Sequence, residues 1–397
     1  MMLKKFPCAG TPINLMDLMR GIRGELRGMD SVKAFENDLR DVLGVKEAFA
    51  VGSGTAAFYI ALEVLKKLSD KKEVILPAYT APILKLPVER AGLKTVLCEV
   101  SLETFNLDPL KLEEVITGDT LCIVPVHLFG IPSPMEQIKR IADEKNVFII
   151  EDNAQSLGTR SDGRLTGGNG DIGILSFQRG KNLSTYTGGA LVTNSESIAD
   201  LIGKELDRFV KEQKVNKLII MIKAILVSII VKPEVYGVLY PVVEPLKSRE
   251  LHHDFEVKAY TPFQAGLGQS LLHSLEEFSI MRNRNGMNLL RGLTGLKGYI
   301  LPQPPENSFI AFSQFPLLVK DKDKIELLIG RLWKEGIEAT RMYLRPMHRI
   351  FDLGYKENPD PFPNATVIAE KLLLLPTHPL VHDGAIDKMI NVLMEME

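Results

Sequence analysis

The sequence predicts an α/β protein whose mostly parallel sheet is followed by a smaller α+β domain. The chain has 397 residues, 45% of them hydrophobic, which exceeds the roughly 250–300 residues that one hydrophobic core usually serves. Between about residues 45 and 195, short apolar runs alternate with longer segments of helical period. That alternation is typical of parallel strands joined by helices. We therefore expect a large domain at 1–250 and a small domain at 251–397.

Five short apolar runs in the first half are predicted to be buried strands. They are rich in Val and Ile and end at turn residues or charges, as strands covered on both faces do. The runs are AFAV (48–51), EVIL (73–76), TVLCEV (95–100), LCIVPV (121–126) and VFIIED (147–152). The segments between them, such as 55–68 and 135–146, have helical spacing.

The second half predicts fewer and looser elements. Residues 264–285 have the pattern of one long helix, 309–319 that of a strand, and 327–337 that of a helix. Ahead of them, a charged helix is expected at 197–214.

An apolar insertion at about 215–246 interrupts the alternation. Within 218–231 only Lys223 and Ser228 are polar, but 14 residues are too few for a membrane span, which needs about 20. Several lysines surround the segment, so an in-plane membrane helix is one interpretation. The other is a helix buried between subunits or domains.

Composition excludes several classes of protein. Lys plus Arg total 48 and Asp plus Glu total 50, a net charge of -2, so no nucleic acid is expected as a partner. The three cysteines are scattered, which indicates a reducing compartment and neither a disulfide scaffold nor a zinc site. The first residues lack the apolar core of a secretory signal. We expect a cytoplasmic protein without a bound metal.

Two glycine-rich or strand-end segments suggest a ligand site. VGSGTAA (51–57) links a strand to a helix, and the free N–H groups there, with the Thr55 hydroxyl, can bind an anion. The same residues also serve as an ordinary helix cap. Asp152 ends a strongly apolar strand, which is where α/β sheets place ligands, although a helix-capping role is the alternative.

Lys181 is the candidate reactive residue. It lies in a tight loop between an apolar strand that ends at Ser176 and a second strand that opens at Gly188-Gly189. A lysine amine reacts with a carbonyl only when it is held and can lose its proton, which burial favours. His127, at another strand end, is either a ligand contact or a structural histidine.

Ordered blocks along the chain resemble the DegT/DnrJ/EryC1/StrS family of sugar aminotransferases. They are GVKEAFAVGSGTAAFYIAL, EVILPAYTAPI, PVHLFGIPSPM, IIEDNAQSLGT, KNLSTYTGGALVTN, YLRPMH and LPTHPLVHD. The resemblance implies the type I fold of pyridoxal-phosphate-dependent transferases, with a mostly parallel seven-stranded sheet in the large domain. It also implies a homodimer.

The resemblance assigns roles to single residues. Lys181 would carry pyridoxal 5'-phosphate as a Schiff base and move the proton between Cα and C4′. Asp152 would pair with the pyridine nitrogen, and Gln155 would approach the phenolic oxygen of the ring. Phosphate-binding positions match Gly54, Thr55 and Ser176, and His348 matches a histidine on the substrate side. Related dehydratases have histidine in place of the lysine, so Lys181 favours transamination.

Three positions depart from the family pattern. Ala81 stands where an aromatic residue often stacks on the ring, and we expect Tyr79 to supply that face. Tyr186-Thr187 replaces a glycine-glutamate pair. Val257 stands where many relatives offer an asparagine to the phosphate of a neighbouring subunit.

The resemblance implies transfer of an amino group from glutamate to a keto-sugar, normally a nucleotide sugar, for surface polysaccharide synthesis. Two alternatives stay open. One is a non-catalytic or regulatory protein that keeps the fold, and the other is an aminotransferase for a cyclitol or a lipid-linked ketone.

Overall fold

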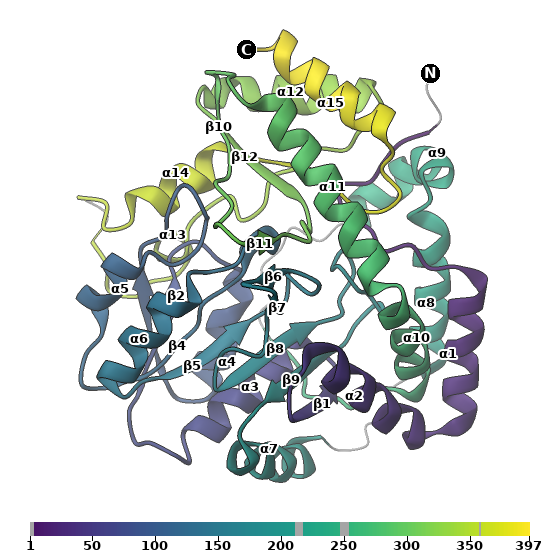
Figure 1. The fold of residues 1–397 in the computed structure, drawn as a ribbon. Coiled ribbons are helices and arrows are strands. Elements are labelled where there is room, and N and C mark those ends of the chain that lie inside the picture. Colours follow the sequence, from purple (N-terminus) through teal and green to yellow (C-terminus); the bar gives the residue numbers. More distant parts are fainter. Residues whose placement is uncertain (1–3, 211–216, 247–253, 357–358) are drawn as a thin grey trace.

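A seven-stranded sheet forms the centre of the molecule (Figure 1). The computed structural model describes residues 4–210, 217–246, 254–356 and 359–397. In spatial order the strands are β1 (Glu47–Val51), β9 (Gly189–Thr193), β8 (Ile172–Ser176), β5 (Phe148–Asp152), β4 (Thr120–Ile123), β2 (Glu73–Pro77) and β3 (Lys94–Cys98). From β8 to β3 all pairs are parallel, whereas β9 is antiparallel to both β8 and β1. The predicted α/β class is confirmed.

Alternation along the strands places apolar side chains on both faces of the sheet. Ile75, Ile123 and Ile149 belong to one core cluster with residues of α5 and α6. Their strand neighbours Val74 and Ile150 belong to the cluster that contains α3. Helices on both faces explain why the strands are continuous apolar runs. These helices are α3 (Gly54–Leu65), α4 (Lys85–Arg90), α5 (Pro109–Val115), α6 (Met135–Lys145) and α7 (Glu196–Phe209).

The long helix expected at 264–285 is wrong, because the chain forms two helices there. α10 (Pro262–His273) ends at Ser274, which caps both helices with a φ of -95° and a ψ of 0°, and α11 (Leu275–Leu293) follows. The two pack on different partners. α10 lies against α1 (Leu15–Arg27) and α2 (Met29–Leu43), whereas α11 lies against α15 (Asp383–Glu395).

A three-stranded antiparallel sheet organises the C-terminal part, at the top of Figure 1. It consists of β10 (Tyr299–Ile300), β12 (Phe315–Val319) and β13 (Leu372–Leu375). The helices around it are α12 (Ile325–Lys334), α13 (Met347–Ile350), α14 (Pro363–Lys371) and α15. The division of the chain near residue 250 stays a prediction.

The strand expected at 309–319 is interrupted. Within this range only β11 (Ser308–Phe309) and β12 are strands. β11 pairs with β6 (Arg160–Ser161), which pairs in turn with β7 (Arg164–Leu165). Between them, side chains take the place of a neighbouring strand. Arg282 donates to the carbonyls of Phe312 (3.3 Å) and Ser313 (3.2 Å), so these groups are satisfied without sheet pairing.

The apolar insertion is helical, as predicted. α8 (Lys217–Ile230) is followed by α9 (Pro233–Val243). None of the helices that the structure describes has the length and apolar character needed to cross a membrane. The charged helix expected at 197–214 corresponds to α7, which ends at Phe209. Residues 211–214 of that expected helix lie outside the described residues. Short 3-10 helices occupy Pro82–Leu84, Leu128–Gly130, Glu244–Leu246 and Lys322–Lys324.

The segment at residues 5–11 ties distant parts of the chain together. The Lys5 N–H donates to the Pro233 carbonyl in the insertion (2.9 Å) and the Phe6 N–H to the Gly336 carbonyl after α12 (2.8 Å). At its other end, the Thr11 hydroxyl donates to the carbonyl of Lys181 (2.7 Å).

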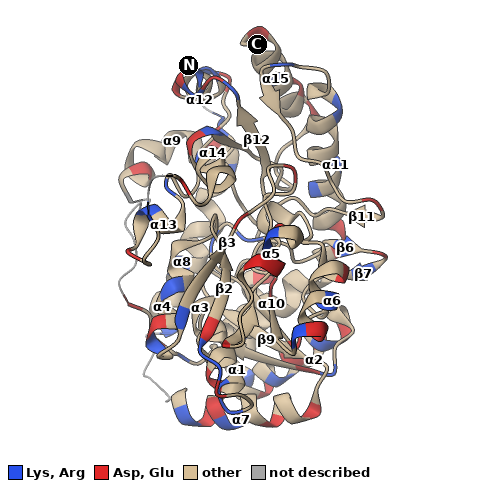
Figure 2. Ribbon diagram, turned by 90° about the vertical axis from the view of Figure 1, so that its left-hand side faces the viewer, with Lys and Arg blue, Asp and Glu red and all other residues tan. Residues whose placement is uncertain are grey.

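Charged residues lie mostly on the outer helices, whereas the strands are mostly uncharged (Figure 2). Cys8, Cys98 and Cys122 are buried, and none of the three forms a disulfide.

The buried carboxylate of Glu151 fixes the loop that enters β8. It accepts hydrogen bonds from the N–H groups of Gly167 (2.7 Å), Asn169 (2.6 Å) and Gly170 (3.0 Å), and from Nε2 of His127 (2.8 Å). Since the N–H of Ser133 donates to Nδ1 of His127 (2.8 Å), the ring proton lies on Nε2. Burial alone would raise the pKa of Glu151, but the hydrogen bonds from His127 and the backbone lower it.

We expect Glu151→Ala to lower the free energy of unfolding by about 3–5 kcal/mol, because three N–H groups and His127 lose a buried acceptor. Chemical denaturation measures the change, with Glu144→Ala on the exposed side of α6 as the matched control. The lowered pKa means that the contribution of Glu151 is present above its ordinary value of 4.5 and is lost as the pH falls through its folded pKa. A cost for Glu151→Ala no larger than that for the control would contradict this role.

Candidate active site

Asp152 and Lys181 come together at the carboxyl edge of the sheet. Asp152 is the last residue of β5, and Lys181 lies in the loop that follows the neighbouring strand β8. The charges of the two side chains act on each other's pKa. Parallel neighbouring strands end at the same edge, which is why two residues 29 positions apart in the sequence meet there.

Burial shifts both groups towards their neutral forms. Desolvation raises the pKa of Asp152, while a hydrogen bond from the Ala154 N–H (2.9 Å) and the charge of Lys181 act in the opposite direction. Desolvation likewise lowers the pKa of Lys181, and the charge of Asp152 partly restores it. A cationic partner would therefore stabilise the charged form of Asp152. The Lys181 amine loses its proton more easily than a surface lysine does.

The start of α3 and the end of β8 adjoin in a candidate anion site, called the cradle below. The Ser53 side chain caps α3 by accepting a hydrogen bond from the Ala56 N–H (3.1 Å). Gly54 and Thr55 are the first two residues of the helix and lie beside this cap. A Cβ atom on Gly54 would lie 3.3 Å from the Ser176 hydroxyl oxygen, which shows that the two residues are in contact. Gly54, Thr55 and Ser176, which the family resemblance assigns to one phosphate site, thus lie together.

Gly189 lets β9 approach this cradle closely. A Cβ atom at position 189 would lie 2.5 Å from the Gly54 nitrogen, a distance that no side chain can occupy. The glycine is therefore required by the close packing of two backbones and not by an unusual φ.

The loop that carries Lys181 is held on both sides. Nδ2 of Asn182 donates to the carbonyls of Leu157 (2.9 Å) and Ala311 (2.8 Å). Nε2 of Gln264, at the start of α10, donates to the Thr187 carbonyl (2.8 Å). These contacts explain how the loop stays ordered with Tyr186-Thr187 in place of glycine and glutamate. Val257, at the position of the family's asparagine, is buried in the apolar core.

Gln155 meets a residue for which the sequence predicted no role. Its Oε1 accepts from the Phe129 N–H (3.2 Å), and its side chain lies close enough to Tyr343 to lower the pKa of that tyrosine. Burial and the charge of Asp152 raise the pKa of Tyr343, which has a left-handed φ of 47°. The position within YLRPMH was the only sequence clue to Tyr343, since its partners lie almost 190 residues away.

Tyr79 contacts the same segment of the C-terminal part. It is fully buried, its hydroxyl donates to the Met342 carbonyl, and its ring meets that of Tyr343 edge-on with centroids 5.8 Å apart. Its predicted role of stacking on a cofactor ring stays a prediction.

The two histidines considered from the sequence differ in their contacts. His127 is fully buried between Ser133 and Glu151, so it is the structural histidine of the two alternatives. His348, in α13, lies 3.1 Å from a carboxylate oxygen of Asp360, with its ring against Phe362. α13 is joined to the end of β2 by a hydrogen bond from the Met347 N–H to the Ala78 carbonyl (2.9 Å). A substrate role for His348 stays a prediction.

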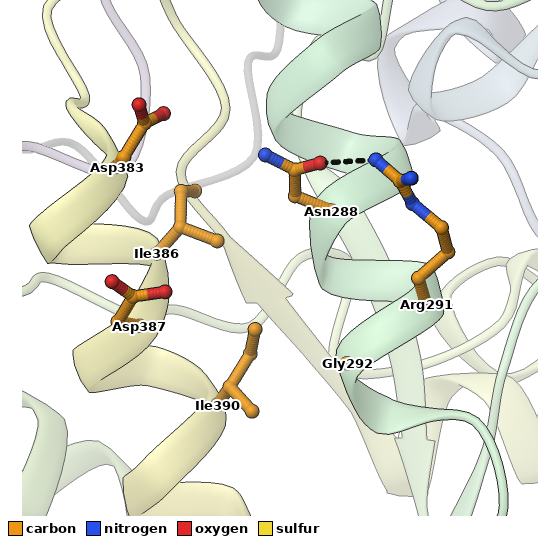
Figure 3. A pocket seen from close by; sticks show the side chains of 7 residues that line it. All are labelled: Asn288, Arg291, Gly292, Asp383, Ile386, Asp387 and Ile390. Atoms are coloured by element: carbon orange, nitrogen blue, oxygen red, sulfur yellow. Dashed lines mark hydrogen bonds between the residues drawn. The ribbon is translucent and has the colours of Figure 1, made fainter.

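An open groove of about 400 Å³ between α11 and α15 is separate from these residues (Figure 3). Asn288 and Arg291 face Asp383, Ile386 and Asp387 across it. None of the predicted site residues lines it, so the candidate site is assigned from the sheet edge. Within the described part of the chain, no group of three or more His, Cys, Asp and Glu side chains is arranged to hold a metal ion.

The arrangement fits pyridoxal phosphate. A protonated ring nitrogen would offset the cost of burying Asp152, the N-terminus of α3 with Ser176 would take the phosphate, and Lys181 would supply the amine. Gln155 follows Asp152 by three residues and would approach the phenolic edge of the ring.

Comparison with known proteins agrees with this fit. The family model described as the DegT/DnrJ/EryC1/StrS aminotransferase family matches residues 21–218 and 254–394. The chain is 28% identical over 372 residues to the spore coat polysaccharide biosynthesis protein SpsC of Bacillus subtilis, covering 92% of this chain and 89% of SpsC. It is 38% identical over 165 residues to the GDP-perosamine synthase of Caulobacter vibrioides, covering 42% of this chain and 44% of that enzyme.

A solved structure of S. venezuelae DesV in complex with a ketimine intermediate is also similar. It has a TM-score of 0.74 and 26% sequence identity, and the match covers 92% of this chain and 88% of DesV. With the family model matched over most of its length, the chain belongs to the DegT/DnrJ/EryC1/StrS aminotransferase family and is a pyridoxal-phosphate-dependent aminotransferase.

Proposed function

We propose that this protein transfers the amino group of glutamate to a keto-sugar carried on a nucleotide, in the synthesis of a surface polysaccharide. The observation that carries the proposal is the opposition of Lys181 and Asp152 at the sheet edge, beside the cradle of Gly54, Thr55 and Ser176. The named relatives support the acceptor class, since one makes a GDP-linked amino sugar and another serves a spore coat polysaccharide.

Each residue has a defined task in this proposal. Bound pyridoxal phosphate supplies an electron sink that makes the Cα proton of an amino acid removable. Asp152 would hold the ring nitrogen protonated, and Gln155 would contact the phenolic edge. Lys181 would anchor the cofactor and would move the proton between Cα of the donor and C4′ of the cofactor. His348, with Asp360 behind it, would contact the acceptor.

The proposal extends to the state of the protein in the cell. A homodimer and a cytoplasmic location follow from the family resemblance and from the composition, and both stay predictions.

Lys181→Ala should abolish the visible absorption band that forms when pyridoxal phosphate is added to the wild type. In the wild type, glutamate should convert that band to a near-ultraviolet one, and turnover by the variant should fall at least 100-fold, on the order of what one acid–base group contributes. Lys204→Ala, an exposed lysine on α7, is the matched control.

Either of two results would count against the proposal. A wild type that forms no band lacks the expected cofactor chemistry. A band that glutamate leaves unchanged would rule out glutamate as the donor or favour a regulatory protein that only binds the cofactor.

Asp152→Asn should lower the pKa of Lys181 in the cofactor-free protein. Desolvation already depresses that pKa below 10.5, and the Asp152 charge is what raises it again. Competitive labelling with acetic anhydride, followed by mass spectrometry across a pH series, measures the pKa of Lys181. The labelling of Lys204 in the same sample is the internal reference. We expect the Lys181 curve to move to lower pH in the variant. A shift to higher pH would show that the two side chains are not coupled as described.

Gly189→Ala should weaken binding of pyridoxal phosphate by roughly tenfold or more, because the added methyl group displaces the start of α3 from the phosphate. Gly203→Ala on α7 is the control, since a Cβ atom there meets no other atom within 4 Å. Titration followed by absorbance gives the affinity, and thermal unfolding confirms that both variants fold. Equal affinity of the Gly189→Ala and Gly203→Ala variants for pyridoxal phosphate would show that the cradle does not bind the phosphate.

A further inference from the structure

We propose that the insertion formed by α8 and α9 docks on the surface of a bilayer that contains anionic lipids. The family model stops at residue 218 and resumes at 254, so the match omits almost all of this hairpin. Its outward surface, called the insertion face below, is made of large aliphatic side chains that are 36–65% exposed. They are Leu218, Ile219, Ile222, Leu226, Ile229, Val238, Leu239 and Val242.

α8 has the inverse of the polarity that a surface helix normally shows. Its buried residues are the small Ala224 and Ser228, and the Ser228 hydroxyl donates to the Ile225 carbonyl of the preceding turn (2.7 Å). The large aliphatic residues at 218, 222, 226 and 229 recur every three to four positions and therefore share the opposite face. A contiguous apolar surface of this kind on a soluble chain marks a contact with a membrane or another protein.

The charge around the face selects a lipid surface over a second copy of the chain. Lys217, Lys223 and Lys232 are exposed, and residues 217–233 contain no carboxylate. Lys217 also pairs with Glu25 of α1 (3.3 Å), which leaves Lys223 and Lys232 as the main positive charges at the face. In a symmetric contact between two copies of this face, lysines would approach lysines. Anionic headgroups instead supply the opposite charge around an apolar contact. The nearest acidic residue of the hairpin, Glu234, pairs with Lys4 (2.9 Å).

The dimensions of α8 fit a helix that lies in the plane of the interface. Fourteen residues give a length of about 21 Å, and no described helix is suited to crossing the bilayer. Apolar side chains on one face with lysines at its edges are what an in-plane helix needs to bury one side among acyl chains.

Docking there would bring the active-site loop close to the bilayer. The Lys223 ammonium lies 5.8 Å from the ring centroid of Tyr186, which follows Lys181 by five residues in the same loop. Ala224 and Met221 of α8 pack in the same core cluster as Tyr186. This inference rests on the proposed function. If that function holds, docking would let the enzyme act on a sugar that is held at the membrane.

Co-sedimentation of the full-length protein with vesicles tests the docking. Vesicles of phosphatidylcholine with one quarter phosphatidylglycerol, at low salt, should pellet the wild type. The triple variant Ile222→Ser, Leu226→Ser, Ile229→Ser should bind at least tenfold more weakly, because its apolar face is removed. A matched variant with three exposed apolar residues elsewhere, Leu110→Ser, Leu327→Ser, Met394→Ser, should bind like the wild type.

The charge component is tested separately. Lys217→Gln, Lys223→Gln, Lys232→Gln should lose binding by on the order of tenfold or more, and raised salt should mimic it in the wild type. The assay needs neither cofactor nor substrate. The glutamate-driven spectral change, measured on the same triple serine variant, should equal that of the wild type, so failure of the catalytic proposal and failure of docking are told apart.

Three results would overturn the docking proposal. The first is a wild type that stays in the supernatant with anionic vesicles at low salt. The second is a triple serine variant that pellets as well as its matched control. The third is a change from dimer to monomer in the triple serine variant with no vesicle binding by the wild type, which would assign the face to a second copy of the chain.

Discussion

Two adjacent carboxylates at the end of β5 organise this site, and the alternation of a β-strand separates their tasks. Successive side chains of a strand point to opposite sides, so Glu151 and Asp152 face different surroundings. Glu151 accepts hydrogen bonds from the backbone of residues 167–170 and so positions the entry to β8. Asp152 faces Lys181 beyond the end of that same strand. The position of the Lys181 amine thus depends on Glu151, although Glu151 faces away from it.

Sequence patterns located the segments of this region because the determinants of each segment are local. A buried strand ending in Asp152, the glycine turn at 52–54 and the loop of Lys181 each have a pattern within a few residues. One topological rule then suffices to unite them, since parallel strands of one sheet present their carboxyl ends at a common edge. The same reasoning cannot assign roles that only bound cofactor would show.

The parts that the sequence did not predict depend on distant contacts. Tyr343 reaches Gln155, and Gln264 fixes the Thr187 carbonyl, through folding of segments 77 or more residues apart. The break at Ser274 has the same origin, because α10 and α11 follow different neighbours although their combined sequence has one helical period. Between β11 and β12, Arg282 satisfies backbone carbonyls that a strand would otherwise pair, which no local pattern reveals.

The segment at residues 5–11 makes the region of Lys181 sensitive to events far from it. Because that segment bonds to the insertion, to the end of α12 and to the Lys181 carbonyl, tension applied ahead of Lys5 would reach all three together. A bulky fusion on that side would pull on the loop that holds the reactive amine. α15, by contrast, packs on α11 and α12 on the small sheet's side of the molecule (Figure 1), so a load applied to α15 would act first on those two helices.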